Sequence, residues 1–285
     1  MIAGLGVLVI LDLWPVDKRY FNDDNFVAKK KSGNFFAIQP YEEVLLEDPD
    51  YFRVYNLADN PFSESRTSYR LKSIGGYSAA KLRRYQDLIE EHLVTMHMPV
   101  IGMLNAKYFL SDDDGTITPH KNSFAMGNAW FVEALKPVDT PQEEIDDLNR
   151  IDLQRFAVID KEFVPMVADM HPGIAPDATV TLTAHTPETL DYDVSTSTPG
   201  VVVFSEIYYP HGWKASIDGA PADHFRVNYL LRAMNVPAGQ HKIHFVFDPD
   251  SVRKGDTLAI IFTLLMYLIT LGIIGAALWK RFKKA

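Results

Sequence analysis

The sequence has 285 residues, of which 47% are hydrophobic, a formal net charge of -9 and no cysteine. A chain of this length can bury a sizeable core and form one or two folded domains. The lack of cysteine excludes disulfide bonds and cysteine-ligated zinc, and the acidic balance argues against nucleic acid or another polyanion as a partner of the chain as a whole.

Residues 1–14, MIAGLGVLVILDLW, form an apolar segment with only 11 residues before Asp12. This segment is too short to cross a bilayer, and it lacks the basic start and the cleavage site of a signal peptide. We therefore expect the outer end of a transmembrane helix whose first part is missing, so that the chain is a C-terminal piece of a larger protein. The alternative is a short apolar strand or a segment that lies on the membrane surface.

Residues 15–165 mix helix and strand patterns, which predicts an α+β region. A helix is expected over residues 78–96 with Ser78 as its N-cap, and a second helix is expected after Thr140, where a proline takes the first helical position. The apolar stripe of the first helix consists of Leu82, Tyr85, Ile89, Leu93 and Met96. Strands are expected at residues 52–57, 105–110, 128–135 and 155–160.

Residues 66–86 contain six basic residues and no acidic residue, which is unusual in an acidic chain. Gly75 and Gly76 precede the expected helix, and the backbone N–H groups at a helix N-terminus can hold a phosphate. Cations near a membrane also attract anionic lipid headgroups. The alternative is that these cations pair with acids of their own domain, such as Asp87. The candidate phosphate- or lipid-binding residues are Arg66, Lys72, Gly75, Gly76, Lys81, Arg83 and Arg84.

Acidic and histidine clusters give no indication of a metal site. Asp112 to Asp114 lack the alternating spacing and the closing glutamate of a calcium loop, and we expect them at the solvated tip of a hairpin. His241 and His244 lie three apart in an expected strand, so their rings should point to opposite faces. The sequence therefore predicts neither a metal site nor a cofactor, and it supplies no catalytic residue.

Residues 166–255 form the next region, in which apolar and polar side chains alternate strictly from about Ala178 onward. In ATVTLTAH, for example, Val180 and Leu182 face one way and the threonines face the other. Six to eight short strands of this kind within about 70 residues predict an antiparallel β-sandwich. Further strands are expected in LDYDVS, VVVFSEIYY, WKASI, YLLRAMNV and HKIHFVF.

The segment EIYYPHGW, residues 206–213, gathers aromatic residues and one acid at the end of a strand. Aromatic rings can stack on the apolar face of a sugar while a carboxylate accepts hydrogen bonds from its hydroxyl groups. The alternative is that Trp213 and one tyrosine fill the sandwich core. The candidate sugar-stacking residues are Glu206, Tyr208, Tyr209 and Trp213.

The C-terminus carries the strongest local signal in the chain. Leu258 to Trp279 form 22 consecutive uncharged residues, which span about 33 Å as a helix and are long enough to cross a bilayer. We therefore expect a transmembrane helix over residues 256–280. The following residues 281–285 form a basic tail, which the positive-inside rule places in the cytoplasm, so that the preceding domain lies outside. Without Asp12 and the four cations that follow Trp279, Lys280, Arg281, Lys283 and Lys284, 24 basic residues face 36 acidic ones in the intervening chain, a net charge of -12.

Five segments follow one another ahead of the final apolar helix: NPFSESRTSYRLKSIGGYSAAKLRRYQDLI, MLNAKYFL, GNAWFV, FSEIYYPHGWKASIDG and NYLLRAMNVPAGQHKIHFVFDP. In this order they resemble the C-terminal part of the YfhO family of bacterial membrane proteins. The resemblance covers nearly the whole chain from Asp12 onward. It implies a large multi-spanning protein that acts as a glycosyltransferase of the GT-C type, which takes a sugar from a lipid-phosphate carrier and attaches it to a cell-envelope polymer.

The resemblance also implies that the catalytic acids lie in an early outer loop, a portion that this sequence lacks. Our hypothesis is that the chain is the extracytoplasmic C-terminal part of such an enzyme in the bacterial cell membrane, inactive by itself. Its implied partners are membrane lipid, a lipid-phosphate-linked sugar, an envelope glycan and the missing N-terminal helices. The alternative is a membrane-anchored module that binds a glycan or acts as a scaffold without being an enzyme.

Overall fold

The computed structural model describes residues 2–26, 36–168 and 173–283 and divides the chain into two compact units, Met1–Pro49 and Asp50–Ala285. The first unit is helical and contains α1 (Ile2–Tyr20), η1 (Asp23–Asn25) and α3 (Pro40–Leu46). Since the apolar N-terminal segment lies in α1, the alternative of a short strand there is wrong.

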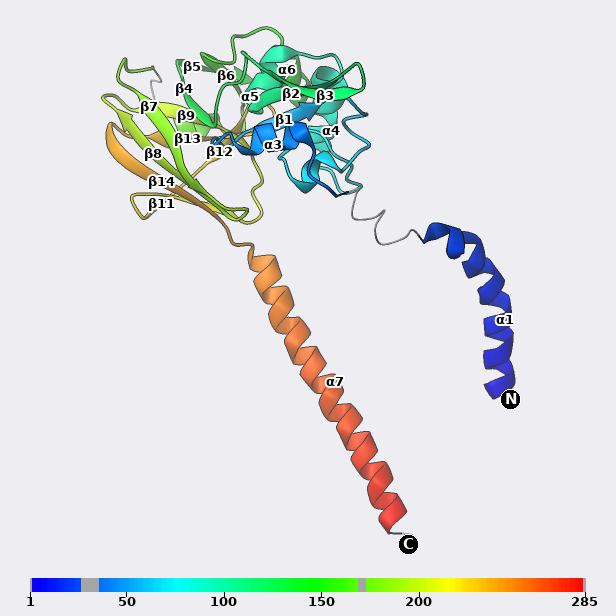
Figure 1. The fold of residues 1–285 in the computed structure, drawn as a ribbon. Coiled ribbons are helices and arrows are strands. Elements are labelled where there is room, and N and C mark those ends of the chain that lie inside the picture. Colours follow the sequence, from blue (N-terminus) through cyan, green and yellow to red (C-terminus); the bar gives the residue numbers. More distant parts are fainter. Residues whose placement is uncertain (1, 27–35, 169–172, 284–285) are drawn as a thin grey trace. The chain divides into compact units, whose positions relative to one another are not determined.

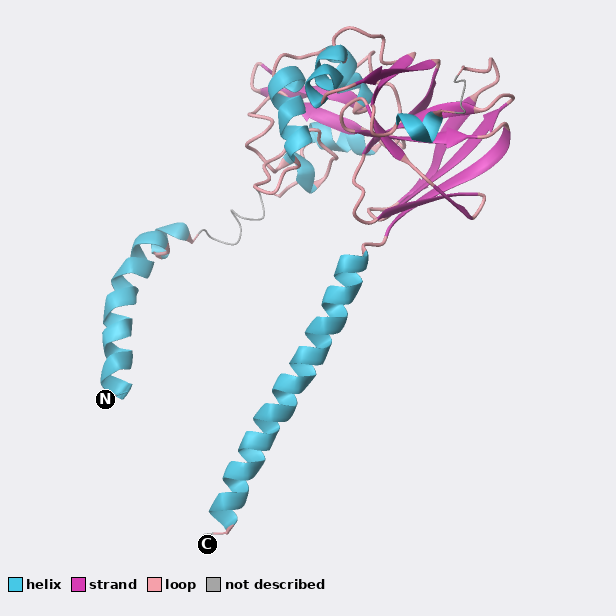
Figure 2. Ribbon diagram, turned by 180° about the vertical axis from the view of Figure 1, so that it is seen from behind, coloured by secondary structure: helices cyan, strands magenta, loops and turns pink. Residues whose placement is uncertain are grey.

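The second unit is an α+β region followed by a β-sandwich and a long C-terminal helix, as predicted (Figure 1). Figure 2 shows the same helices and strands from behind. Its α+β region consists of β1 (Arg53–Asn56), η2 (Thr67–Tyr69), α4 (Arg83–Leu88), η3 (Ile89–Leu93), α5 (Met98–Met103), β2 (Ala106–Asp113), β3 (Thr116–Lys121), β4 (Ala129–Val132), β5 (Ala134–Val138), α6 (Pro141–Asp147), β6 (Phe156–Asp160) and η4 (Val164–Val167). The strands that follow are β7 (Thr179–His185), β8 (Thr189–Thr196), β9 (Gly200–Ile207), β10 (Trp213–Ile217), β11 (Ala220–Ala222), β12 (Phe225–Val227), β13 (Leu231–Val236) and β14 (Gly239–Phe247), and the last helix is α7 (Asp250–Phe282).

Two parallel strand pairs organise the α+β region. β1 pairs in parallel with β2, and β5 pairs in parallel with β6. Parallel neighbours require a crossover, and the helices between the strands provide it: α4, η3 and α5 in the first pair and α6 in the second. The helix after Thr140 is confirmed in detail, because the Thr140 side chain accepts a hydrogen bond from the backbone N–H of Glu143 and Pro141 takes the first helical position.

The three consecutive aspartates lie at a hairpin tip, as predicted. β2 and β3 pair antiparallel from Asp113 and Thr116 onward, and Asp114 and Gly115 between them adopt positive φ angles of 53° and 83°. The predicted strand over residues 128–135 is divided in two, because β4 and β5 join different sheets on either side of Glu133.

The predicted helix over residues 78–96 begins later than expected. α4 starts at Arg83, so Ser78 is not its N-cap and no helix N-terminus follows Gly76 directly. The reason lies in the preceding loop, where the Gly76 N–H donates to the Pro61 carbonyl and a Cβ atom on Gly75 would lie only 2.1 Å from that oxygen. The glycines therefore pack the loop against residues 60–64 and do not start the helix.

The apolar stripe of this helix also differs from the prediction. Residues Ile89–Leu93 form a π-helix, in which the Val94 N–H donates to the Ile89 carbonyl. The wider turn shifts the phase of the side chains. Leu88, Ile89 and Leu93 are buried, whereas the expected Leu82 and Met96 are exposed.

The sandwich consists of two antiparallel sheets. One sheet has the strand order β11-β10-β14-β8-β7, and the other has the order β12-β13-β9-β4. The second sheet therefore includes β4, a strand that precedes β9, the next strand of this sheet along the chain, by about 70 residues. The predicted alternation is confirmed: Leu190, Tyr192 and Val194 are buried in β8, as are Ile243 and Phe245 in β14.

The four-stranded sheet is covered on both faces. In β9, Val202 and Phe204 belong to the core between the two sheets, while Val201 and Val203 belong to the core shared with the α+β region. A strand that is buried on both faces reads as a continuous apolar run. This accounts for VVVF in the sequence.

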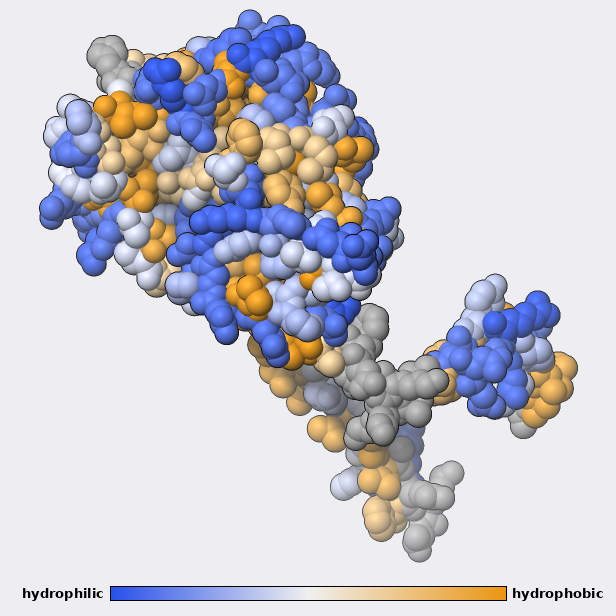
Figure 3. Space-filling view, turned by 45° about the horizontal axis from the view of Figure 1, so that its top comes forward, coloured by the Kyte–Doolittle hydropathy of each residue, from blue (hydrophilic) through white to orange (hydrophobic). Residues whose placement is uncertain are grey.

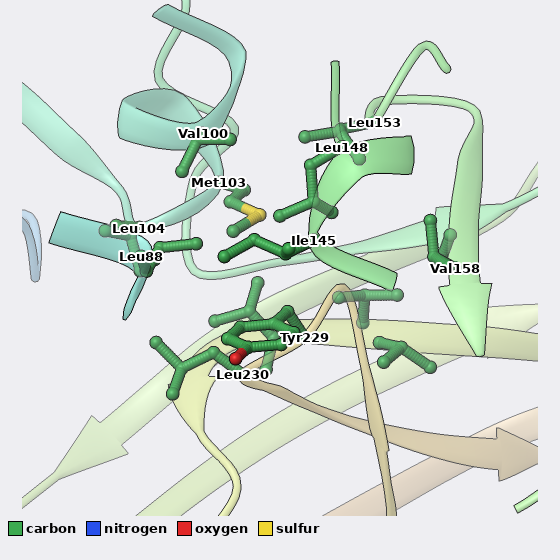
Figure 4. Packing of buried hydrophobic residues seen from close by; sticks show 14 of the residues in the cluster. Leu88, Val100, Met103, Leu104, Ile145, Leu148, Leu153, Val158, Tyr229 and Leu230 are labelled. Carbon is green, nitrogen blue, oxygen red and sulfur yellow. The ribbon is translucent and has the colours of Figure 1, made fainter. Parts of the chain in front are cut away.

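The core on the other face of this sheet, which contains Val201 and Val203, joins the α+β region to the sandwich. Figure 4 shows Tyr229 and Leu230, which precede β13, packed beside Ile145 of α6 and Leu88 of α4. The surface over these layers is mixed: hydrophilic and hydrophobic patches lie side by side on the face seen in Figure 3.

α7 is long and apolar enough to cross a membrane over Asp250–Lys280, and within the described residues it is the one helix with this property. The apolar side chains of this helix whose burial is described are exposed. Such a helix needs a nonaqueous environment, because about 25 cal/mol of unfavourable free energy accompanies each Å² of apolar surface left in water.

Candidate functional site

The predicted sugar-stacking residues lie where β9 ends and β10 begins. Glu206 is near the end of β9, and Trp213 is the first residue of β10. Gly212 precedes Trp213 with a φ of 137°, a conformation that a residue with a Cβ atom rarely adopts. The turn over residues 208–212 thus returns the chain so that both side chains line one hollow.

This hollow is a cavity of about 320 Å³. It brings together one predicted phosphate-binding residue, Lys72, and two predicted sugar-stacking residues, Glu206 and Trp213. Its lining residues are Tyr51, Lys72, His185, Thr186, Pro187, Leu190, Glu206 and Trp213. We call it the Trp213 cavity.

The Glu206 carboxylate is held in a fixed position. It forms an ion pair of 2.8 Å with Arg53 Nη2, and its side chain is 14% exposed. The other terminal nitrogen of Arg53 donates to the carbonyls of Leu104, at 3.2 Å, and Ser205, at 2.7 Å. Burial and the neighbouring Glu206 raise the pKa of Tyr51 to about 12, so the Tyr51 hydroxyl keeps its proton and remains a hydrogen-bond donor.

Trp213 is half-buried and backed by an arginine. The Arg232 guanidinium carbon lies 4.2 Å from the centroid of the indole ring and 4.9 Å from the ring of Phe245. Because side chains alternate along β13, Arg232 shares the face of Met234 and Val236, which lie in the core between the two sheets. A charged side chain thus occupies the sandwich interior directly behind one wall of the cavity.

Lys72 and His185 are exposed residues of the cavity lining, and both lie close to the ring of Tyr51. Lys72 Nζ is 4.6 Å from the centroid of the Tyr51 ring, and the ring of His185 is 4.3 Å from it. Partial burial, followed by the charge of Arg53, lowers the pKa of Lys72, and burial followed by the charge of Lys72 lowers the pKa of His185. The cavity lining therefore presents a positive charge close to aromatic faces.

Tyr208 and Tyr209 lie outside the Trp213 cavity. With Arg83 and Arg84 they line a neighbouring hollow of about 290 Å³. The Tyr208 ring packs 5.6 Å from Phe163, so this tyrosine also contributes to the core shared with the α+β region. The four predicted sugar-stacking residues are thus divided between two hollows.

The remaining cations of the basic segment have different environments. Arg83 is 82% exposed and forms an ion pair of 2.9 Å with Asp87, one of the predicted internal partners. Arg84 forms an ion pair of 2.8 Å with the buried Glu144. Lys81 precedes the helix, and its Nζ donates a hydrogen bond to the Gln86 side chain at 3.2 Å. Lys81 also lines a third hollow, together with Arg53 and Gly75. Arg66 is half-buried at the start of η2.

The Gly75-Gly76 turn does not form the expected phosphate-binding helix start. The Gly75 N–H donates to Ser73 Oγ at 3.0 Å, and the Gly76 N–H donates to the Pro61 carbonyl at 2.6 Å. Both donors are used inside the protein. Gly75 still borders the third hollow, but as backbone packed against Pro61.

Sequence reasoning missed Tyr51, Arg53, His185 and Arg232. For Arg232 a signal exists: a lone arginine interrupts the apolar strand pattern YLLRAMNV and takes an inward-facing position. A charged residue at a core position is expensive unless it is paired or has a function. Tyr51, Arg53 and His185 have no such signal in the sequence around them, because only the folded chain brings them to the Trp213 cavity.

The two histidines of the predicted strand HKIHFVF, His241 and His244, contact different aspartates. His241 Nδ1 lies 2.7 Å from Asp218, and His244 Nδ1 lies 2.6 Å from Asp191. Among the residues that the structure describes, no group of three or more His, Cys, Asp or Glu side chains could hold a metal ion.

Comparisons with known proteins give no further guide. No protein-family model matches the chain, and neither a curated protein nor a solved structure matches it.

Proposed function

We propose that this chain is the outer part of a membrane-bound glycosyltransferase of the GT-C type, and that it holds a saccharide of the cell envelope in the Trp213 cavity. The observation that carries the proposal is the position of the Trp213 ring beside the fixed Glu206–Arg53 pair. The alternative, a glycan-binding module that is not an enzyme, uses the same cavity.

The lining of the cavity suits a sugar. Sugars present apolar C–H faces, which pack on aromatic rings, and hydroxyl groups, which need fixed polar partners. Trp213 and Tyr51 supply the rings, while Glu206, held by Arg53, supplies acceptor oxygens that do not have to be ordered on binding. A volume of about 320 Å³ accommodates one or two sugar rings.

The proposed membrane position of the domain is supported by α7, which is long and apolar enough to cross a bilayer. In this proposal the helix anchors the domain at a bilayer surface, and the basic residues after Trp279 lie on the cytoplasmic side, as the positive-inside rule favours. The saccharide would then belong to the cell envelope or to a lipid-phosphate carrier. Arg66, Lys81 and Arg83, as cations of the basic segment, would face lipid headgroups or the phosphate of the carrier.

Binding is tested with the full chain in nanodiscs of phosphatidylcholine, which carry no net charge. The Trp213→Leu variant should bind envelope oligosaccharides on the order of tenfold more weakly, because the stacking ring is lost. Trp14→Leu, an equivalent change on the exposed surface of α1, is the matched control. A wild-type chain that binds no envelope oligosaccharide, or a Trp213→Leu variant that binds as tightly as the wild type, would refute the proposal.

The enzyme and the module are separated by a second experiment. The resemblance implies that the catalytic acids of GT-C enzymes lie in an early outer loop, and none of the 285 residues is assigned to that loop. In this proposal the 285 residues alone should transfer no sugar from a lipid-linked donor above a boiled control. Reading the DNA upstream of the Met1 codon shows whether it continues into hydrophobic segments with an acidic outer loop, as the transferase requires. A ribosome-binding site at Met1 without such segments would favour the module.

A further inference from the structure

The charges around the Trp213 cavity do not balance. Three cations, Arg53, Lys72 and Arg232, surround a single acid, Glu206, and Arg53 already pairs with that acid at 2.8 Å. The positive excess lies in a partly buried environment, where charges are screened less than at an open surface.

Arg232 is the most unusual of the three cations. The residue is 1% exposed, and its one hydrogen bond runs from Nη2 to the Ile207 carbonyl at 3.1 Å. Its Nε and Nη1 atoms are buried and have no partner. Within residues 36–168 and 173–283 no carboxylate lies close enough to Arg232 for an ion pair, although the charge of Glu206 acts on it from a greater distance. The interior therefore holds a positive charge without an ion-pair partner behind Trp213.

Lys72 places a second unpaired cation in the cavity lining. Its ammonium group contacts the face of Tyr51, and it forms no ion pair with any residue in the described parts of the chain. The long side chain is exposed, so an incoming ligand can reach it without a change in the fold. Because Lys72 forms no ion pair in the described parts of the chain, its charge is available to a ligand that enters the cavity.

We propose that the saccharide held in the Trp213 cavity carries a negative charge, a carboxylate or a phosphate group, and that Lys72 contacts this group directly. The inference rests on the proposed function, because it specifies the ligand of the same cavity. Arg53 and Arg232 contribute through the positive potential that they create at the cavity, and Glu206 accepts hydrogen bonds from neutral hydroxyl groups of the same sugar. The lowered pKa of Lys72 agrees with this potential, because burial, its larger cause, is followed by the charge of Arg53. The pKa of Arg232 is lowered by burial, against the opposing charge of Glu206.

Three probes that differ only at one carbon test the inference: methyl glucoside, methyl glucuronide and methyl glucoside 6-phosphate. They are titrated against the full chain in phosphatidylcholine nanodiscs, with NMR of the probe as the readout. At least one acidic probe should bind on the order of tenfold more tightly than the neutral glucoside, because hydrogen bonds to charged groups are stronger. The two acidic probes distinguish a carboxylate from a phosphate.

Two variants locate the effect. Lys72→Gln should reduce the affinity for the preferred acidic probe to that for the neutral glucoside, while Lys242→Gln, which removes an 84% exposed cation elsewhere on the sandwich, should leave the preference intact. Equal binding of all three probes, or an unchanged preference in Lys72→Gln, would overturn this inference and leave the proposed function standing. Failure of all three probes to bind would count against both.

Discussion

Arg84 Nη1 lies 2.8 Å from Oε2 of Glu144, whose side chain is completely buried. The other oxygen of Glu144 accepts a hydrogen bond from the Tyr229 backbone N–H at 3.0 Å, and Arg84 Nη1 also donates to the Tyr229 carbonyl at 3.2 Å. One residue of the basic segment thus connects α4, α6 and the turn before β13. Its guanidinium group serves the packing of the α+β region against the sandwich.

We predict that Arg84→Gln lowers the free energy of unfolding by on the order of 3 kcal/mol, because it leaves the Glu144 carboxylate buried with a weaker partner. Arg83→Gln, the neighbouring change at an exposed ion pair, should cost about 0.5 kcal/mol or less. Urea denaturation of the two variants in the same detergent measures the difference. Equal midpoints for both would show that the buried pair contributes nothing beyond a surface pair.

A second prediction concerns Gly75. A Cβ atom there would lie 2.1 Å from the Pro61 carbonyl oxygen, so Gly75→Ala must push two backbone segments apart. We expect a loss of about 1–3 kcal/mol, the usual cost of overpacking. Gly173→Ala is the matched control, because its Cβ atom would meet nothing within 4 Å. Thermal unfolding of both variants measures the effect, and a Gly75→Ala midpoint equal to that of the control would contradict the close contact.

Most of the fold could be predicted from the sequence because the decisive signals are local. The alternation of apolar and polar side chains predicts β8 and β14, and the Thr140-Pro141 pair predicts the start of α6. The long uncharged run predicts α7. The start of α4 could not be predicted in this way. Ser78 is a good local cap, but Gly75 packs against Pro61 in the preceding loop, and a π-helix at residues 89–93 shifts the phase of the side chains. Neither feature has a signature in the apolar pattern.

The candidate site is a harder case, since its parts are remote in sequence. Tyr51 and Lys72 come from the α+β region and Trp213 comes from the sandwich, and no periodicity relates them. The sequence did indicate Lys72, Glu206 and Trp213 as chemically suitable side chains, but it assigned Lys72 to one ligand and the other two to another. Their meeting in one cavity is a property of the fold.

A third prediction concerns pH. Burial, and after it the charge of Arg232, lowers the pKa of His224 from 6.5 to about 4. Between these values the unfolded chain binds a proton at this position and the folded chain does not, so stability is complete above pH 6.5 and is lost as the pH falls toward 4. The shift corresponds to a loss on the order of 3 kcal/mol. The groups facing His224 are Arg232, Asp223 and the rings of Tyr208 and Phe245.

The test compares the wild type with His224→Gln, because other groups act in the same range of pH. The raised pKa values of His241 and Glu144 oppose the effect, while the lowered pKa values of His92 and His97 add to it. These contributions are common to both proteins and cancel in the difference. Stability of the variant, measured by denaturation between pH 7 and pH 4, should fall less steeply than that of the wild type. Parallel curves would mean that His224 is protonated as readily in the folded chain as in the unfolded one.

The final prediction contrasts two buried arginines in adjacent strands. Arg226, on β12, lies 3.2 Å from Asp160 and 3.7 Å from Glu144, whereas Arg232, on β13, has no acid within ion-pairing distance in the described part of the chain. Replacing a paired arginine leaves buried carboxylates without a partner, while replacing an unpaired one removes a charge that is costly to bury. Arg226→Met should therefore lower the free energy of unfolding by about 3–5 kcal/mol. Arg232→Met should leave it unchanged or raise it, since Met fills the space between Trp213 and Phe245. The interactions lost are the hydrogen bond to the Ile207 carbonyl, at a cost of about 1 kcal/mol, and the contacts of the guanidinium group with the two rings, which Met replaces with apolar contacts. If the charge of Arg232 serves ligand binding, the same variant should bind the acidic glucose probes more weakly while it unfolds at the same or a higher temperature. A large loss of stability in Arg232→Met, comparable to that in Arg226→Met, would show that the buried guanidinium group maintains the sandwich and is not kept for a ligand.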